Sequence, residues 1–185
     1  MTNMTQEPQV FSIDLNAEID RYFDDSSLPS NEPPRIVILM GGPASGKTRL
    51  RREKFSTGYV LVDAADIFIN LSRGGYYDFP DAFEEPMNLI GRLVAIRAIR
   101  ERRNIVTEII GSDFEETVNL IEALKSVGYS VEATAVTCDI EVAMERNMSR
   151  GENNISSYYA EPYQRQWLIE AVREFGNGLD TSDPD

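Results

Sequence analysis

The chain has 185 residues, a formal net charge of −13, a single cysteine and no histidine. That length suits one α/β domain with a substantial core and is too short for two ordinary domains. The lone Cys138 excludes an internal disulfide, and the absence of histidine excludes His-dependent catalytic triads and His-ligated zinc. The negative charge disfavours a nucleic-acid substrate, because it repels a polyanion.

Nothing in the sequence points to a membrane or to export. No apolar run approaches the roughly 20 residues that a membrane-spanning helix needs. The first residues, MTNMTQEPQ, lack the basic start and apolar region of a secretory signal. A cytoplasmic location without membrane contact is therefore expected.

Residues 1–34 are polar and acidic, with a weak apolar pattern that predicts one short helix over residues 16–23. We interpret them as an N-terminal extension. The apolar, β-branched run at residues 35–40 is typical of a strand buried on both faces of a parallel sheet. It leads directly into GGPASGKT, and the helix formers KTRLRREKF follow. The predicted order is therefore strand, glycine-rich loop, helix.

Further strands and helices alternate along the rest of the chain. Strands are predicted at residues 59–62, 104–110 and 129–137, and helices at residues 86–103, 113–128, 139–150 and 161–175. Residues 67–85 are expected to form a short helix that begins near Ile67 and then an irregular, aromatic-rich excursion. This alternation predicts a three-layer α/β P-loop NTPase fold with a mainly parallel central sheet flanked by helices. The domain spans residues 35–178, and the acidic tail, residues 179–185, is expected to be disordered.

The segment GGPASGKT matches the phosphate-binding pattern G-x-x-x-x-G-K-[ST]. Its glycines let backbone N–H groups converge on phosphate oxygens, and the following helix presents its positive end to the same anion. Lys47 is expected to reach the β- and γ-phosphates, and Thr48 to offer its hydroxyl to Mg²⁺. The residues expected to bind the nucleotide are Gly41, Gly42, Pro43, Ala44, Ser45, Gly46, Lys47 and Thr48.

Two aspartates follow the second predicted strand. In a parallel sheet the carboxyl ends of neighbouring strands open on the same crevice, so Asp63 and Asp66 are expected to face the γ-phosphate. A kinase needs one carboxylate to accept the proton of the acceptor hydroxyl and another to help hold Mg²⁺. Asp66 is the candidate base, and Asp63 is the candidate for metal and substrate binding. The alternative for either aspartate is to cap the following helix.

Glu108 ends the apolar run Ile105-Val-Thr, an arrangement similar to a Walker B strand with glutamate in place of aspartate. We expect it to bind a substrate hydroxyl or to support the metal. The alternative is a strand-end carboxylate paired with a neighbouring arginine.

Arginines on two predicted helices are candidates for anion contacts. Arg146 and Arg150 lie four apart on one face of a helix, where a lid could bring them to the transferring phosphoryl group. A solvated helix face would explain them as well. A second group is locally basic, and its alternative is again a solvated helix face: Arg97, Arg100, Arg102 and Arg103.

The order GGPASGKT, YVLVDAADIF, IVTEIIG and AVTCDIEVAMERNMSRG resembles the zeta-toxin group of P-loop kinases, over about residues 35–172. In that family ATP phosphorylates a hydroxyl of a UDP-linked amino sugar. The resemblance implies that Asp66 is the base, Glu108 the sugar-side carboxylate, and Arg146 or Arg150 a lid arginine. It also implies a possible cognate antitoxin as partner. The chain departs from the family's D-x-D motif, because Asp63 and Asp66 are separated by two residues and Ile69 replaces a basic residue.

These residues predict an ATP- and Mg²⁺-dependent kinase that phosphorylates a hydroxyl of a small molecule, with Asp66, Lys47, Arg146 and Arg150 as catalytic residues. GTP stays open as the nucleotide, although the usual guanine-binding N-K-x-D segment is absent. Two alternatives stay open for function. One is a nucleotide-dependent switch or interaction protein with slow hydrolysis, and the other is a polynucleotide 5′-hydroxyl kinase.

Overall fold

The computed structural model describes residues 14–27, 32–72, 81–111, 113–149 and 178–180. The helices and strands, in chain order, are α1 Leu15–Arg21, β1 Arg35–Met40, α2 Lys47–Lys54, β2 Val60–Val62, α3 Ala64–Leu71, α4 Asp81–Arg100, β3 Ile105–Ile109, α5 Phe114–Ser126, β4 Ser130–Thr137, α6 Ile140–Met148 and β5 Gly178–Asp180. The helix expected over residues 161–175 and residues 73–80 of the expected excursion lie outside the described residues. No helix in the described ranges has both the length and the apolar character needed to cross a membrane.

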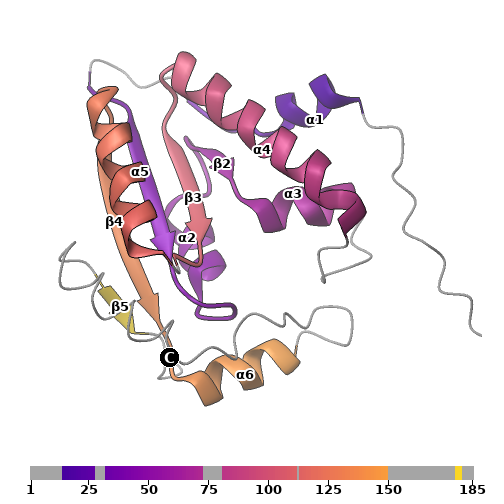
Figure 1. Ribbon diagram of the computed structural model, residues 1–185, viewed down its shortest axis with the longest axis vertical. Coiled ribbons are helices and arrows are strands. Elements are labelled where there is room, and N and C mark those ends of the chain that lie inside the picture. The colour runs from indigo at the N-terminus through magenta and orange to yellow at the C-terminus, as the bar shows by residue number, and fades with distance from the viewer. Residues whose placement is uncertain (1–13, 28–31, 73–80, 112, 150–177, 181–185) are drawn as a thin grey trace, which may run out of the picture.

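The strands form one sheet in the order β2-β3-β1-β4-β5, and every pair of neighbours is parallel. All strands therefore end at the same edge of the sheet (Figure 1). This arrangement confirms the predicted α/β fold with a parallel sheet. It follows from the alternation of strands and helices, since α2, α4 and α5 lie in the crossover connections that return the chain to the starting edge between β1 and β4.

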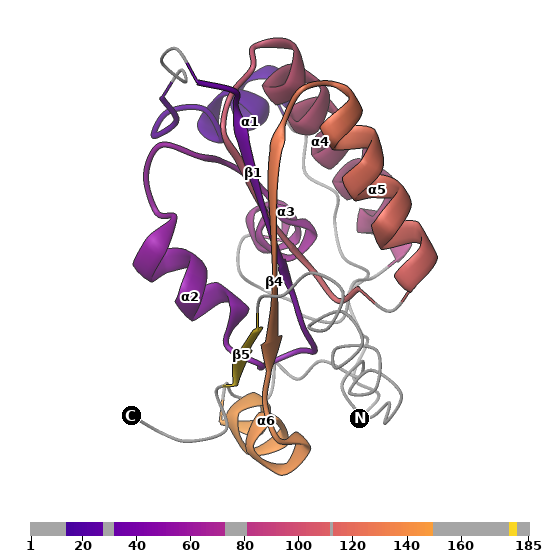
Figure 2. The same cartoon turned by 90° about the vertical axis from the view of Figure 1, so that its left-hand side faces the viewer.

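The central strand β1 is buried on both faces, as its continuous apolar run predicts. Ile36, Ile38 and Met40 belong to the larger core cluster, which also includes residues of α1, α3, α4 and α5. Val37 and Leu39 point to the opposite face and pack in a smaller cluster with Leu50 of α2. Figure 2 shows the resulting three layers, with α2 on one side of the sheet and α4 and α5 on the other.

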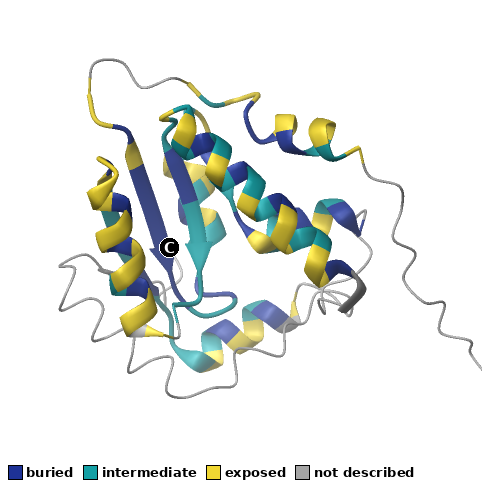
Figure 3. Cartoon of the chain, turned by 45° about the horizontal axis from the view of Figure 1, so that its top comes forward, coloured by how far each residue is buried: buried dark blue, intermediate teal, exposed yellow. Residues whose placement is uncertain are grey.

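Burial follows the same layers (Figure 3). Residues 36–40 of β1 are buried, whereas α5 turns an exposed face outward. Asp113 caps the start of α5, because its carboxylate accepts a hydrogen bond from the backbone N–H of Glu116 at 2.8 Å. These helices cover the sheet and leave the edge formed by the strand ends for the loops.

Several boundaries differ from those predicted. Helix α3 begins at Ala64, ahead of the predicted Ile67, because Asp63 supplies its N-cap. Helix α4 begins at Asp81, ahead of Pro86, and its added turn is anchored by Phe83, whose ring contacts Phe68 edge-on with centroids 5.8 Å apart. Strand β5 includes Leu179 and Asp180, which the sequence analysis assigned to the disordered tail. These residues pair with the edge of β4, a long-range contact that their local composition does not encode.

Candidate nucleotide site

The loop between β1 and α2 has the backbone form of a phosphate cradle. Ala44 has φ of 59° and Gly46 has φ of 100°, so the chain enters the left-handed region twice within three residues. Such turns point successive backbone N–H groups into one concavity, which suits an anion. Gly46 is also the N-cap of α2, whose first N–H groups face the same space.

Gly41 allows the loop to lie directly against β4. A Cβ atom at this position would stand 2.5 Å from the carbonyl oxygen of Val136 and 2.6 Å from the Ser45 Oγ. The Gly41 N–H also donates to the carbonyl oxygen of Ile109 at 3.1 Å, which ties the loop to β3. The first glycine of the pattern is therefore required for packing as well as for phosphate access.

Lys47 folds back over the loop. Its Nζ donates to the carbonyl oxygens of Gly41 at 2.6 Å and Gly42 at 2.9 Å. The ammonium group thus lies at the cradle, where a phosphate oxygen could accept the same donors.

Thr48 and Glu108 are in direct contact across the site. The Thr48 Oγ1 donates to the Glu108 Oε2 at 2.8 Å, and the Arg51 Nε donates to the Glu108 Oε1 at 2.6 Å. The structure therefore contains the arginine pairing that the sequence analysis gave as the alternative use of Glu108, together with a link to the phosphate loop. Arg51 was not singled out from the sequence. Its spacing of three residues from Thr48 on a helix was the available signal.

Asp63 is placed beside Glu108 by the register of the sheet. Val62 of β2 lies opposite Thr107 of β3, so the residues that follow them are neighbours. The Asp63 carboxylate accepts the N–H of Ala65 at 3.1 Å and thereby caps α3. Burial raises the pKa of Asp63 to about 6, and the negative charge of Glu108 adds to this increase.

Asp66 lies in the first turn of α3 and is half-buried. Its Oδ2 accepts a hydrogen bond from the Asn70 Nδ2 at 3.0 Å and lies 3.8 Å from a guanidinium nitrogen of Arg21. Among the described residues, the structure shows no hydrogen bond to its other carboxylate oxygen, Oδ1. Asp66 also contributes to the electrostatic field at Asp63, which places both carboxylates in one region. Neither Arg21 nor Asn70 was singled out from the sequence.

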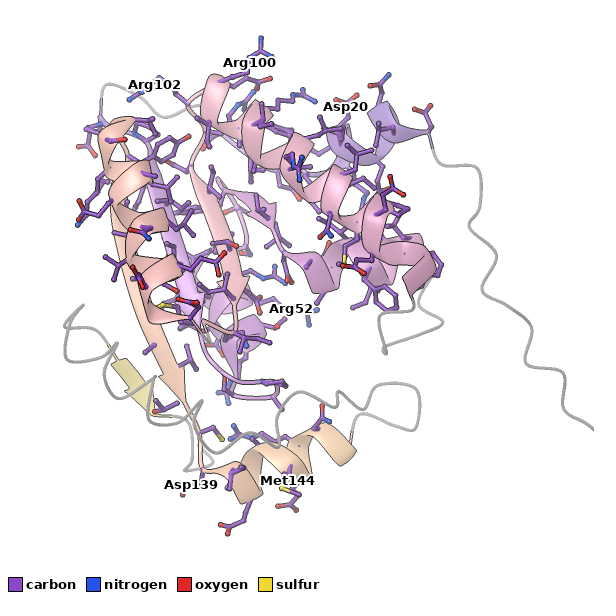
Figure 4. The ribbon with its side chains drawn as sticks, in the orientation of Figure 1. Asp20, Arg52, Arg100, Arg102, Asp139 and Met144 are labelled. Atoms are coloured by element: carbon purple, nitrogen blue, oxygen red, sulfur yellow. The ribbon has the colours of Figure 1, made fainter. Side chains whose placement is uncertain are left out.

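Helix α6 lies beyond the carboxyl ends of the strands (Figure 1). Asp139, labelled in Figure 4, is near the start of this helix. Arg146 is on this helix, and one of its guanidinium nitrogens lies 3.3 Å from the Cys138 Sγ. Arg150 lies outside the described residues. The structure therefore puts the first of the two candidate lid arginines close to the end of β4.

The second arginine group lies at the other end of the molecule. Arg100 and Arg102 are labelled at the end opposite Asp139 in Figure 4, where α4 leads into the start of β3. Arg97 forms ion pairs with Asp20 and Glu101, and Arg103 pairs with the same Glu101. This group is separated from the phosphate loop by the length of the sheet.

The residues present fit a magnesium-bound nucleotide. The loop provides N–H donors and an ammonium group for phosphates, and Thr48, Asp63 and Glu108 provide oxygen atoms. Magnesium commonly takes few protein ligands and completes its coordination with phosphate oxygens and water. Within the described residues, no group of three or more Asp, Glu, His or Cys is placed to hold a metal ion.

The parallel sheet and the loop together define a kinase-like P-loop protein. The family model for zeta toxin matches residues 19–181, and the chain therefore belongs to the zeta-toxin family. The match begins at Ile19, within α1, and therefore starts ahead of β1. A comparison with curated proteins finds no match.

Solved structures with the same fold include three that are informative. The PezAT toxin–antitoxin system of Streptococcus pneumoniae matches with a TM-score of 0.59 at 16% identity, over 74% of this chain and 60% of that one. The AvrRxo1-ORF1:-ORF2 structure with ATP matches with a TM-score of 0.59 at 19% identity, over 85% and 58%. A candidate kinase from Chloroflexus aurantiacus matches with a TM-score of 0.52 at 14% identity, over 83% and 91%.

These identities support a common fold only. The chain spans 60% of the length of the matched PezAT chain and 58% of the AvrRxo1-ORF1 structure's chain. PezAT is a toxin–antitoxin system. AvrRxo1-ORF1:-ORF2 is a complex of two components, and its structure contains ATP.

Proposed function

We propose that this protein transfers the γ-phosphoryl group of ATP to a hydroxyl group of a small molecule, with a UDP-linked amino sugar as the acceptor class that its family suggests. The observation that supports this most directly is the contact between Thr48 and Glu108, with Asp63 alongside. It joins the end of the phosphate loop to carboxylates at the ends of neighbouring strands, as phosphoryl transfer requires.

Each residue has a role in this proposal. Bound Mg·ATP supplies the phosphoryl group and partial neutralisation of its charge. Lys47 binds the β- and γ-phosphates, and the Thr48 hydroxyl is a metal ligand. Asp63 and Glu108 hold the metal's water shell or the acceptor's hydroxyl groups.

Asp66 accepts the proton of the acceptor hydroxyl. Its Oδ2 is held by Asn70 and Arg21, which leaves Oδ1 to approach a substrate. A carboxylate held in this way is oriented before the acceptor binds, so less ordering is needed in the transition state. Arg146 stabilises charge on the transferring group from the lid side, and Arg150 is proposed for the same role.

The position of the arginine group on α4 favours a small acceptor over a polynucleotide. A polynucleotide kinase needs basic residues along a path that leads to its phosphate loop. Here the basic group lies at the opposite end of the sheet, and two of its members are paired with carboxylates. A cognate antitoxin that covers the nucleotide site is a further expectation from the family.

The test is ATP turnover with separate panels of UDP-sugars, nucleosides, small alcohols and a 5′-hydroxyl oligonucleotide. Turnover that depends on a small acceptor would support the proposal. Acceptor-independent slow hydrolysis, with protease sensitivity that differs between ATP and ADP, would favour the nucleotide-dependent switch instead.

The variant Asp66→Asn should lower the turnover number by about 10²- to 10⁴-fold, the usual contribution of a general base, and leave ATP affinity unchanged. Asp20→Asn is the matched control, because Asp20 is an exposed aspartate on α1 that pairs with Arg97. Loss of ATP binding in Asp66→Asn, with no separate effect on transfer, would assign Asp66 a structural role.

A further inference from the structure

Arg51 is a largely buried cation that the proposed chemistry does not yet use. It lies on α2 one turn after Thr48, and only 12% of its side chain is exposed. Residues three apart on a helix share a face, so Thr48 and Arg51 approach the sheet together. Both side chains meet the same partner, Glu108 of β3.

The Glu108 carboxylate is held at both oxygens. Its Oε1 accepts from the Arg51 Nε at 2.6 Å and its Oε2 accepts from the Thr48 Oγ1 at 2.8 Å, while 6% of the side chain is exposed. Two bonds to opposite oxygens fix the rotation of the carboxylate plane. The Thr48 hydroxyl proton is thereby directed to Glu108, and its lone pairs point elsewhere.

A second ion pair on α2, between Arg49 and Glu53, is exposed to water. Arg49 and Glu53 pair at 2.9 Å, with 67% and 55% of their side chains exposed. Water screens such a pair, and its contribution is small. The Arg51–Glu108 pair is shielded from water, so removal of the arginine would leave a buried carboxylate without its cation, beside Asp63.

We propose that Arg51 is a positioning residue for magnesium: it holds Glu108 so that the Thr48 hydroxyl donates to the carboxylate and presents its lone pairs to the metal ion of Mg·ATP. This role rests on the proposed nucleotide binding and does not require a particular acceptor. Arg51 touches neither the nucleotide nor the metal in this proposal, and it acts through Glu108 alone. Partners that orient a ligand in this way typically affect metal affinity by about 10- to 100-fold.

The experiment measures ATP affinity by titration calorimetry, once with Mg²⁺ and once with EDTA. In Arg51→Met the gain in affinity that Mg²⁺ provides should fall by about 10-fold or more, while the affinity in EDTA stays unchanged. Arg51→Lys should recover part of the gain, since an ammonium group can still pair with Glu108. Arg49→Met, on the exposed face of the same helix, should behave as the unmodified protein.

A double variant tests whether Arg51 acts through Glu108. Glu108→Gln and Arg51→Met/Glu108→Gln should lose the same Mg²⁺-dependent gain, because the second change removes nothing more. The double variant also removes the unpaired buried charge, so it remains measurable if Arg51→Met does not fold.

Equal loss of ATP affinity with and without Mg²⁺ in Arg51→Met, or a further loss in the double variant, would overturn the positioning role. Because the readout is binding, a failure to find any phosphate acceptor would count against the proposed function and leave the role of Arg51 intact.

Discussion

At the scale of single residues, Asp63 combines a local and a long-range role. Its carboxylate caps α3, a use that the sequence offered as one alternative. The pairing of β2 with β3 also buries it next to Glu108, and its pKa rises to about 6. The folded protein therefore binds a proton at Asp63 in a pH range where the unfolded chain has already lost it.

This difference predicts a pH-dependent effect of Asp63→Asn. The stability associated with protonated Asp63 is present below its ordinary pKa of 3.8 and is lost as the pH rises through about 6. Asparagine keeps the helix cap without titrating. Relative to Asp63→Asn, the unmodified protein should lose up to about 3 kcal/mol of unfolding free energy between pH 4 and pH 7.

Urea denaturation of both proteins at several pH values, in metal-free buffer, measures this difference. If the unfolding free energies of the two proteins changed in parallel over the whole pH range, the ionised form of Asp63 would not be destabilised by its surroundings.

The residues of the site differ in how far the sequence could predict them. The phosphate loop follows from a contiguous pattern, and Glu108 from its place at the end of an apolar strand. Arg51 is one of several basic residues in KTRLRREKF. Only the packing of α2 against the sheet determines which of them faces Glu108.

At the scale of elements, α1 is part of the main core, although the sequence analysis placed it in an N-terminal extension. The helix was predicted at residues 16–23 and lies at Leu15–Arg21. Ile19, Tyr22 and Phe23 belong to the same cluster as residues of α3 and α4. The guanidinium of Arg97 lies over the Phe23 ring, 4.1 Å from its centroid. The apolar pattern looked weak because two of these residues follow the end of a short helix.

Truncation of this helix's core contact should therefore destabilise the whole domain. Ile19→Ala removes a buried side chain, and we expect a loss of about 2–4 kcal/mol in unfolding free energy. Asn16→Ala, on an exposed position of α1, should change it by less than about 0.5 kcal/mol. Chemical denaturation followed by circular dichroism measures both.

If Ile19→Ala matched its control, α1 would be an appendage of the domain and not part of its core. In that case α1 would not be fixed against the domain, and Arg21 on this helix would not hold the Asp66 carboxylate in place.

At the scale of the whole molecule, the phosphate loop and the arginine group lie at opposite edges of the sheet. The net charge is −13, yet the phosphate loop places Lys47 and the start of α2 at the carboxyl edge of the sheet. The arginine group at the end of α4 and just after it lies at the opposite edge. A phosphate ligand therefore meets local positive potential on an acidic protein, and its binding should stabilise the complete fold.

Thermal unfolding tests this linkage. Mg·ATP at about 100 times its dissociation constant should add about 2.7 kcal/mol of stability, with a melting temperature that rises with ligand concentration. Lys47→Met should abolish the rise, because it removes the ammonium group at the cradle. Lys54→Met, at the exposed end of the same helix, is the control and should retain the rise. An undiminished rise in Lys47→Met would exclude the loop as the nucleotide site.

The sequence by itself determined the fold class, the phosphate loop and the succession of strands and helices, because these depend on periodicity and on contiguous motifs. Tertiary structure decided what depends on strand order and register. It placed β3 between β2 and β1, so that Asp63, Glu108 and Thr48 meet although they are far apart in the chain. It also selected Arg51 as the partner of Glu108 and included α1 in the core. Such contacts join distant segments, and no local pattern specifies which side chains will face each other.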